Sequence, residues 1–117
     1  MAVTAGIQHE GKLLIRHQGR EKAIRLDDIY YMESQNHNVV LCLKNGMIKY
    51  YGKIGDLEEE LRGQFYRIHR GYLINLVYVK GYDRTGVRME NGDKLLVSRY
   101  KYHDFVQAYK DFRSQKA

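Results

Sequence analysis

The chain has 117 residues, the length of one domain with a modest hydrophobic core. Its only cysteine, Cys42, excludes an intramolecular disulfide and a thiolate metal cluster, and the apolar run around it predicts a small core residue. The net charge of +6 is uneven, since residues 1–61 hold 8 Lys or Arg against 9 Asp or Glu and residues 62–117 hold 12 against 5. This asymmetry indicates a polyanionic partner, nucleic acid before a membrane surface, with an inert basic surface as the alternative.

No apolar run approaches the ~20 residues that a membrane-spanning helix needs, and residues 1–6 do not have the pattern of a secretory signal. We therefore expect a soluble cytoplasmic protein with no membrane partner. Residues 1–10 show no periodicity and are predicted to be a flexible N-terminal segment, followed by one domain over residues 11–117.

The first predicted element is a hairpin with strands at residues 13–17 and 22–26, closed around residues 18–19. Asp27-Asp28 is expected to cap a single helical turn, after which a strand resumes over residues 30–35.

The dipeptide Asn45-Gly46 gives the clearest hairpin signal, because it accepts the positive φ of a type I′ turn. Its strands are predicted at residues 39–44 and 47–51. An amphipathic helix follows over residues 54–62 and ends before Gly63. The three consecutive glutamates of this helix are expected to form a solvated face that points away from any anion site.

In the second half, strands are predicted at residues 77–83, 86–90 and 94–97, with a hairpin turn at residues 91–93. From Ser98, a candidate N-cap, the apolar spacing becomes helical. The apolar stripe of this C-terminal helix consists of Phe105, Ala108, Tyr109 and Phe112. The fold class is therefore mainly β, with one short internal helix and a C-terminal helix.

Patterns of catalytic chemistry are missing from the sequence. The five histidines form no zinc-protease pair, and neither a Gly-x-Ser-x-Gly elbow nor a phosphate loop is present. We expect no enzyme activity, no cofactor and no metal site.

The run at residues 65–75 mixes apolar anchors with hydrogen-bond donors at high density. Its cationic and polar members are Arg67, His69 and Arg70, and an arginine offers a planar fork of donors that suits phosphate oxygens and the guanine edge. The alternative for His69 is a satisfied core histidine. This run predicts a strand that holds anion-binding side chains on a rigid sheet.

Two further segments have the same character. Asn36-His37-Asn38 is a polar loop between two strands, although His37 is equally well explained as a turn residue. Val97-Ser98-Arg99 places a hydroxyl and an arginine at a helix start, where backbone N–H groups favour phosphate. The alternative for Arg99 is a solvated helix-start residue.

The order of residues 28–34, 65–75 and 97–99 resembles the LytTR DNA-binding domain of bacterial transcription regulators, over roughly residues 13–112. The resemblance implies an elongated multi-sheet β fold whose loops, rather than a recognition helix, enter the major groove of double-stranded DNA. It also implies the output domain of a response regulator in a two-component system.

The resemblance assigns roles by position. His37, Arg70 and Arg99 are expected to contact bases. The expected phosphate contacts are Asn36, Asn38, Arg67, His69, Ser98 and Lys101.

Two positions affect what the resemblance implies. Gly71 stands where family members often have a small polar residue, so one hydroxyl contact is expected to be missing. Arg70 occupies a variable position and favours guanine through O6 and N7. The family also implies direct-repeat sites bound by two domains, a monomeric free domain and a receiver domain N-terminal in the full-length protein. Since no receiver fits within 117 residues, we expect an excised output domain or a free-standing regulator.

Two other functions remain open from the residues alone. A non-catalytic RNA-binding sheet would use some of the eleven tyrosines as stacking platforms. Against it, Tyr30, Tyr50, Tyr66 and Tyr72 alternate with apolar neighbours and are expected to fill the core. A protein-interaction β module would have incidental charge and no salt-dependent DNA binding.

Overall fold

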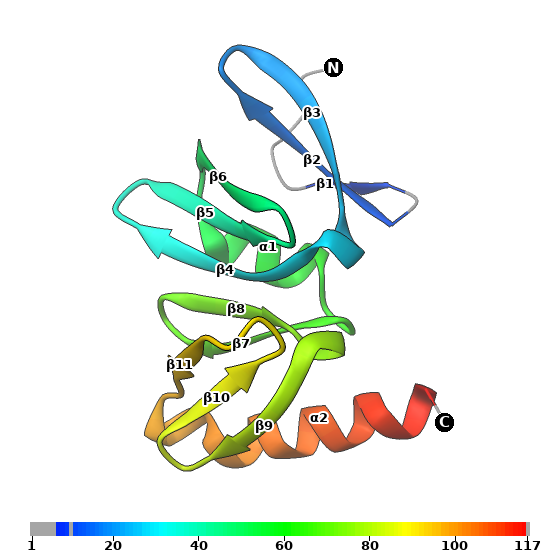
Figure 1. The fold of residues 1–117 in the computed structure, drawn as a ribbon, viewed down its shortest axis with the longest axis vertical. Coiled ribbons are helices and arrows are strands. Elements are labelled where there is room, and N and C mark those ends of the chain that lie inside the picture. The colour runs from blue at the N-terminus through cyan, green and yellow to red at the C-terminus, as the bar shows by residue number, and fades with distance from the viewer. Residues whose placement is uncertain (1–6, 10, 117) are drawn as a thin grey trace.

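The described part of the chain forms three antiparallel sheets and two helices, and the molecule measures 40 × 31 × 25 Å (Figure 1). The computed structural model describes residues 7–9 and 11–116. The first sheet contains β1 (Ile7–His9), β2 (Lys12–His17) and β3 (Arg20–Arg25). The central sheet has the order β6 (Gly46–Tyr51), β5 (Asn38–Leu43), β4 (Ile29–Gln35), β8 (Tyr72–Asn75), β7 (Phe65–His69). The third contains β11 (Lys94–Leu96), β10 (Gly86–Met89) and β9 (Val79–Asp83).

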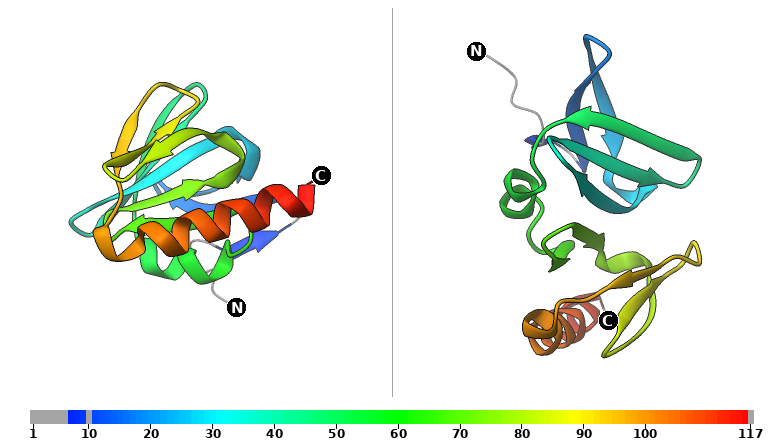
Figure 2. Two further views of the ribbon diagram at one scale, coloured as in Figure 1. Left: turned by 90° about the horizontal axis from the view of Figure 1, so that it is seen from below. Right: turned by 90° about the vertical axis from the view of Figure 1, so that its left-hand side faces the viewer.

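The helices are α1 (Ile54–Glu60) and α2 (Tyr102–Lys116). They lie on the same side of the molecule, and α2 covers one face of the third sheet (Figure 2). Short 3-10 turns occupy Leu26–Asp28, Leu76–Tyr78 and Arg99–Lys101. The predicted mainly β, elongated multi-sheet fold with an internal and a C-terminal helix is confirmed.

Two hydrophobic cores fill the two faces of the central sheet. Successive residues of a strand point to opposite faces, so Leu73 packs in the first core and Ile74 in the second. The first core also contains residues of the first sheet and of α1, whereas the second contains residues of the third sheet and of α2. The predicted stripe of α2 is confirmed, since Phe105 and Phe112 are buried in the second core. One central sheet therefore holds both halves of the domain together.

Asn75 is the buried polar residue of the described core. Its amide nitrogen donates to the carbonyl oxygens of Leu26 at 3.2 Å and Ile29 at 2.9 Å. Its amide oxygen accepts from the backbone N–H of Val77 at 3.1 Å. This last bond ends β8 in a 3-10 turn, so the strand predicted from residue 77 begins at Val79 instead.

The β5–β6 turn corrects one prediction. The strand register pairs Leu43 with Gly46, so Lys44 and Asn45 are the central turn residues. Only Gly46 has a positive φ, of 142°, whereas a type I′ turn requires positive φ at both central positions. By contrast, the first hairpin closes at Gln18 and Gly19 as predicted, with φ of 54° and 75°.

Other local predictions differ in detail. Asp27 and Asp28 lie inside the 3-10 turn, whose N-cap is Arg25, rather than before it. Of the tyrosines expected in the core, Tyr50 is buried, and Tyr30, Tyr66 and Tyr72 are half-buried. Cys42 is also half-buried, and its sulfur accepts from the Asn91 amide at 3.6 Å.

The predicted flexible segment over residues 1–10 contains the strand β1, in which Ile7 pairs with Leu14. Residues 1–6 and 10 lie outside the described part of the chain. No helix among the described residues is long and apolar enough to cross a membrane.

Candidate nucleic-acid interface

Three connecting segments meet on one edge of the domain, at the left of Figure 1. They are the β4–β5 turn, the β7–β8 turn and the link from β11 to α2. The backbone N–H of Ser34, near the end of β4, donates to the carbonyl oxygen of Gly71 in the β7–β8 turn at 2.9 Å. The N–H of Ser98 donates to the carbonyl oxygen of Ile68 on β7 at 2.8 Å. These two bonds fix the three segments relative to one another.

The β4–β5 turn presents His37 to solvent. Asn36 has a φ of 57°, a conformation that asparagine tolerates better than most residues. The carbonyl oxygen of His37 accepts from the backbone N–H of Gly52 at 3.0 Å. The imidazole ring of His37 lies 6.5 Å from the ring of Tyr51. Asn36 and His37 are exposed, and Asn38 is half-buried as the first residue of β5.

The β7–β8 turn presents the exposed side chain of Arg70. Beside it, Nδ1 of His69 accepts from the backbone N–H of Gly71 at 3.0 Å. In the neutral ring the proton is therefore on Nε2, which makes Nε2–H the donor of this half-buried side chain. A Cβ at Gly71 would lie 3.5 Å from His69 Nδ1, an ordinary contact, so packing does not require glycine there.

Arg67 lies behind this turn rather than on the edge. Its Nη1 pairs with a carboxylate oxygen of Glu58 at 3.2 Å, and its Nη2 donates to the carbonyl oxygen of Arg70 at 2.6 Å. The side chain is only 22% exposed. The guanidinium is thus engaged within the fold and holds the backbone that presents Arg70.

Lys101 belongs to the link from β11 to α2, and its side chain lies against Tyr66 of β7. Its Nζ lies 6.0 Å from the centre of the Tyr66 ring. Together with Arg67, Lys101 lines a hollow of about 410 Å³ between α1 and α2, whose walls also include Glu58 and Asp111. The Arg67 and Lys101 side chains thus line a second region, to which the acidic α1 contributes. Arg67 still bonds to the backbone of Arg70, and the backbone of Lys101 bonds to that of Ser98.

The link from β11 to α2 presents Arg99 and Ser98. Arg99 is exposed at the start of the 3-10 turn, and Ser98 is half-buried. The Ser98 side chain makes no capping hydrogen bond, while its carbonyl oxygen accepts from the backbone N–H of Lys101 at 2.9 Å. The Ser98 hydroxyl thus stays available beside Arg99.

The edge has two exposed arginines, Arg70 and Arg99, and the carboxylate of Glu33 lies beside it, next to Tyr72. Ion pairs among the described residues join Arg62 to Glu59, Arg67 to Glu58, and Lys94 to Asp83. Arg70 and Arg99 belong to none of these pairs. Burial raises the pKa of the nearby Tyr72 hydroxyl, so this group remains a neutral donor at physiological pH. An exposed edge with free cations and neutral donors suits an anionic ligand.

One cation of this region was not among the predicted contacts. Arg84, in the turn between β9 and β10, lines a hollow of about 310 Å³ together with Val97, Arg99 and Tyr102. The sequence shows an arginine in a predicted turn, but its position next to Arg99 depends on how the third sheet packs.

Comparisons of the sequence and of the fold with known proteins point to the same family. The family model described as "LytTr DNA-binding domain" matches residues 19–110. No curated protein matches the chain significantly. Among solved structures, the LytTr DNA-binding domain of a putative methyl-accepting/DNA response regulator from Bacillus cereus is similar, with a TM-score of 0.72 and 15% sequence identity. The match covers 86% of this chain and 97% of that one, which shows a shared fold. On the family match over most of its length, the chain belongs to the LytTR DNA-binding domain family.

Proposed function

We propose that this domain binds double-stranded DNA sequence-specifically through loops inserted in the major groove, as the output domain of a bacterial transcription regulator. The observation that supports this most is the pair of backbone hydrogen bonds, Ser34 to Gly71 and Ser98 to Ile68, which hold three exposed segments on one edge. B-DNA presents an unambiguous donor and acceptor pattern in its major groove, so several fixed side chains suffice to read it.

In this proposal His37, Arg70 and Arg99 contact base edges from three separate segments. The two arginines are exposed and free of ion pairs within the described residues, as bidentate contact with guanine requires. The proposed phosphate contacts are Asn36, Asn38, His69 and Ser98. Arg67 is assigned a positioning role, and Lys101 is left out because it lies in the α1–α2 hollow with two carboxylates.

A single domain of this kind has limited specificity. Each arginine–guanine pair contributes about 1–3 kcal/mol of discrimination, and the domain offers two. We therefore propose that two domains, monomeric when free, bind direct-repeat sites. In a longer chain, an N-terminal receiver domain would control their pairing.

Binding sites selected from a random duplex library provide the first test, and Arg99→Ala the second. We expect Arg99→Ala to weaken binding to the selected site about 5- to 100-fold, with a much smaller loss on random duplex, because a base contact is lost. Fluorescence anisotropy with labelled duplexes measures both affinities. Arg20→Ala is the matched control, since Arg20 is an exposed arginine at the start of β3, in the first sheet.

Equal losses on both duplexes would show that Arg99 contacts only phosphate. Preferential displacement of the duplex by single-stranded RNA would instead favour an RNA-binding sheet. Absence of salt-dependent binding to either nucleic acid would favour a protein-interaction module.

A further inference from the structure

We call the edge formed by the β4–β5 turn, the β7–β8 turn and the link from β11 to α2 the reading edge. A hollow beside it has two arginines and no acidic residue in its lining. It measures about 310 Å³ and lies between the β9–β10 turn and the link from β11 to α2. Arg84 and Arg99 are both exposed, and Val97 and Tyr102 complete the walls. Two guanidinium groups around one space repel each other, and an anion between them removes that repulsion.

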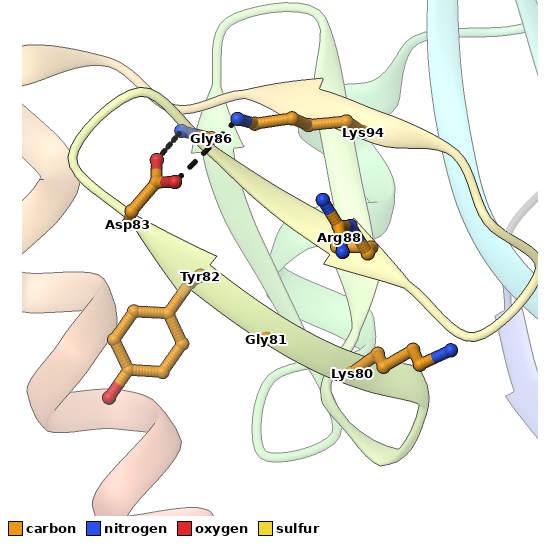
Figure 3. A pocket seen from close by; sticks show the side chains of 7 residues that line it. All are labelled: Lys80, Gly81, Tyr82, Asp83, Gly86, Arg88 and Lys94. Atoms are coloured by element: carbon orange, nitrogen blue, oxygen red, sulfur yellow. Dashed lines mark hydrogen bonds and ion pairs between the residues drawn. The ribbon is translucent and has the colours of Figure 1, made fainter.

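The turn that presents Arg84 is fixed from within. Oδ1 of Asp83 accepts from the backbone N–H of Thr85 at 2.8 Å, from the Thr85 hydroxyl and from the N–H of Gly86 at 3.2 Å. Oδ2 of Asp83 lies 3.6 Å from Nζ of Lys94 on β11, as Figure 3 shows. These interactions lower the pKa of Asp83 to about 2, and the hydrogen bond from the Thr85 hydroxyl contributes most. The carboxylate therefore stays ionised and keeps the turn closed at physiological pH.

Gly86 adds a second constraint on the same turn. A Cβ at this position would lie 2.6 Å from the carbonyl oxygen of Leu95, so only glycine lets β10 approach β11 this closely. The Arg84 guanidinium itself lies 5.5 Å from the centre of the Tyr102 ring, a cation–π distance. Tyr102 is held in turn by the ring of Tyr82, at 6.4 Å. The contact with Tyr102 thus places the Arg84 guanidinium at the wall of the hollow that Arg99 also lines.

We propose that this hollow is a phosphate-binding site for the DNA backbone and that Arg84 is its main ligand. The inference rests on the proposed function. Arg99 extends from the rim of the hollow to a base edge, and Arg84 binds the phosphate of a neighbouring nucleotide. The site thus adds a fourth segment, the β9–β10 turn, to the three that form the reading edge.

A second basic hollow, on the outer face of the third sheet, supplies the contrast. Its volume is about 350 Å³, and Lys80, Arg88 and Lys94 line it together with Asp83 (Figure 3). Its lining includes an acid and no residue of the three segments on the edge. Arg88 is exposed like Arg84 and lies on β10, the strand that follows the β9–β10 turn, so it is the matched control.

The test compares Arg84→Ala with Arg88→Ala on the selected duplex and on random duplex over a range of salt concentrations. We expect Arg84→Ala to weaken binding to both duplexes by the same factor and to lower the slope of log affinity against log salt by about 1. Arg84→Lys should keep the slope, since the charge remains. Arg88→Ala should leave both affinities and the slope unchanged. Thermal unfolding verifies that each variant is folded.

An unchanged slope for Arg84→Ala would overturn the inference. So would an equal reduction for Arg88→Ala, because only general positive charge would then matter. A loss confined to the selected duplex would make Arg84 a base contact and would also contradict it. These results are distinguishable from failure of the proposed function, because in that case the unmodified domain itself shows no salt-dependent preference for duplex DNA.

Discussion

Arg67 links two parts of the fold through one guanidinium group. It pairs with Glu58 of α1 and donates to the carbonyl oxygen of Arg70 in the β7–β8 turn. Hydrogen bonds that involve a charged group stabilise more than neutral ones, and more so when the donor is shielded from solvent. At 22% exposure, the Arg67 side chain meets this condition. In the proposed function, the effect of Arg67 on DNA binding is indirect, because Arg67 sets where the backbone of Arg70 lies.

We predict that Arg67→Met lowers the free energy of unfolding by about 1.5 kcal/mol, since the charged hydrogen bond to the Arg70 carbonyl is lost. We also expect weaker binding to the selected duplex with little change on random duplex, because Arg70 loses its fixed position. Urea unfolding and anisotropy measure the two effects. Glu58→Gln is the control, as it removes the ion pair with Arg67 and keeps the bond to Arg70. A uniform loss on both duplexes with a lower salt slope would show that Arg67 contacts phosphate after all.

At the scale of elements, the β4–β5 turn is constrained by the positive φ of Asn36, at 57°. In this region a β-branched residue is strained, while glycine is not. The β5–β6 turn also has two central residues, but Asn45 in it does not have a positive φ, so glycine has no conformational advantage at that position. Two turns of similar composition therefore differ in which residues they accept.

We predict that Asn36→Val costs about 1–2 kcal/mol of stability and that Asn36→Gly costs less than about 0.5 kcal/mol. Both variants remove the same amide, so both should weaken DNA binding uniformly if Asn36 contacts phosphate. Chemical unfolding and duplex titration separate the two effects. The corresponding pair at Asn45 should show no advantage for glycine. A larger loss for Asn36→Gly than for Asn36→Val would mean that backbone strain does not determine this turn.

Elements were predictable from the sequence to the extent that their signals are local. Alternation and turn residues located the hairpins, and helical spacing located α2. The pairing of β4 with β8 joins segments about forty positions apart, and no local pattern encodes such a partner. The same limit applies to the site. His37, Arg70 and Arg99 are candidates that the sequence offers because they follow predicted strands. The ion pair of Arg67 with Glu58 and the hollow shared by Arg84 and Arg99 depend instead on packing.

At the scale of the whole molecule, the central sheet shares its two faces between two cores, so neither core exists without it. Asn75 reinforces this coupling. Its amide bonds the carbonyl oxygens of Leu26 and Ile29, which lead into β4, and the N–H of Val77, which leads out of β8. The segments on the reading edge are fixed to the same sheet. Their relative positions therefore depend on the fold of the entire domain.

We predict that Asn75→Ala lowers the free energy of unfolding by about 3 kcal/mol, because it leaves buried backbone groups of Leu26, Ile29 and Val77 without their partner. Asn45→Ala, at an exposed turn position, should change this free energy by less than about 0.5 kcal/mol.

The chain has eleven tyrosines and no tryptophan, so tyrosine fluorescence and far-ultraviolet circular dichroism follow unfolding independently. In urea both signals should change together, and duplex binding should be lost in the same transition, since one sheet serves both cores. Two separate transitions, with binding lost in the first, would show that the cores unfold independently and that the reading edge depends on only one of them.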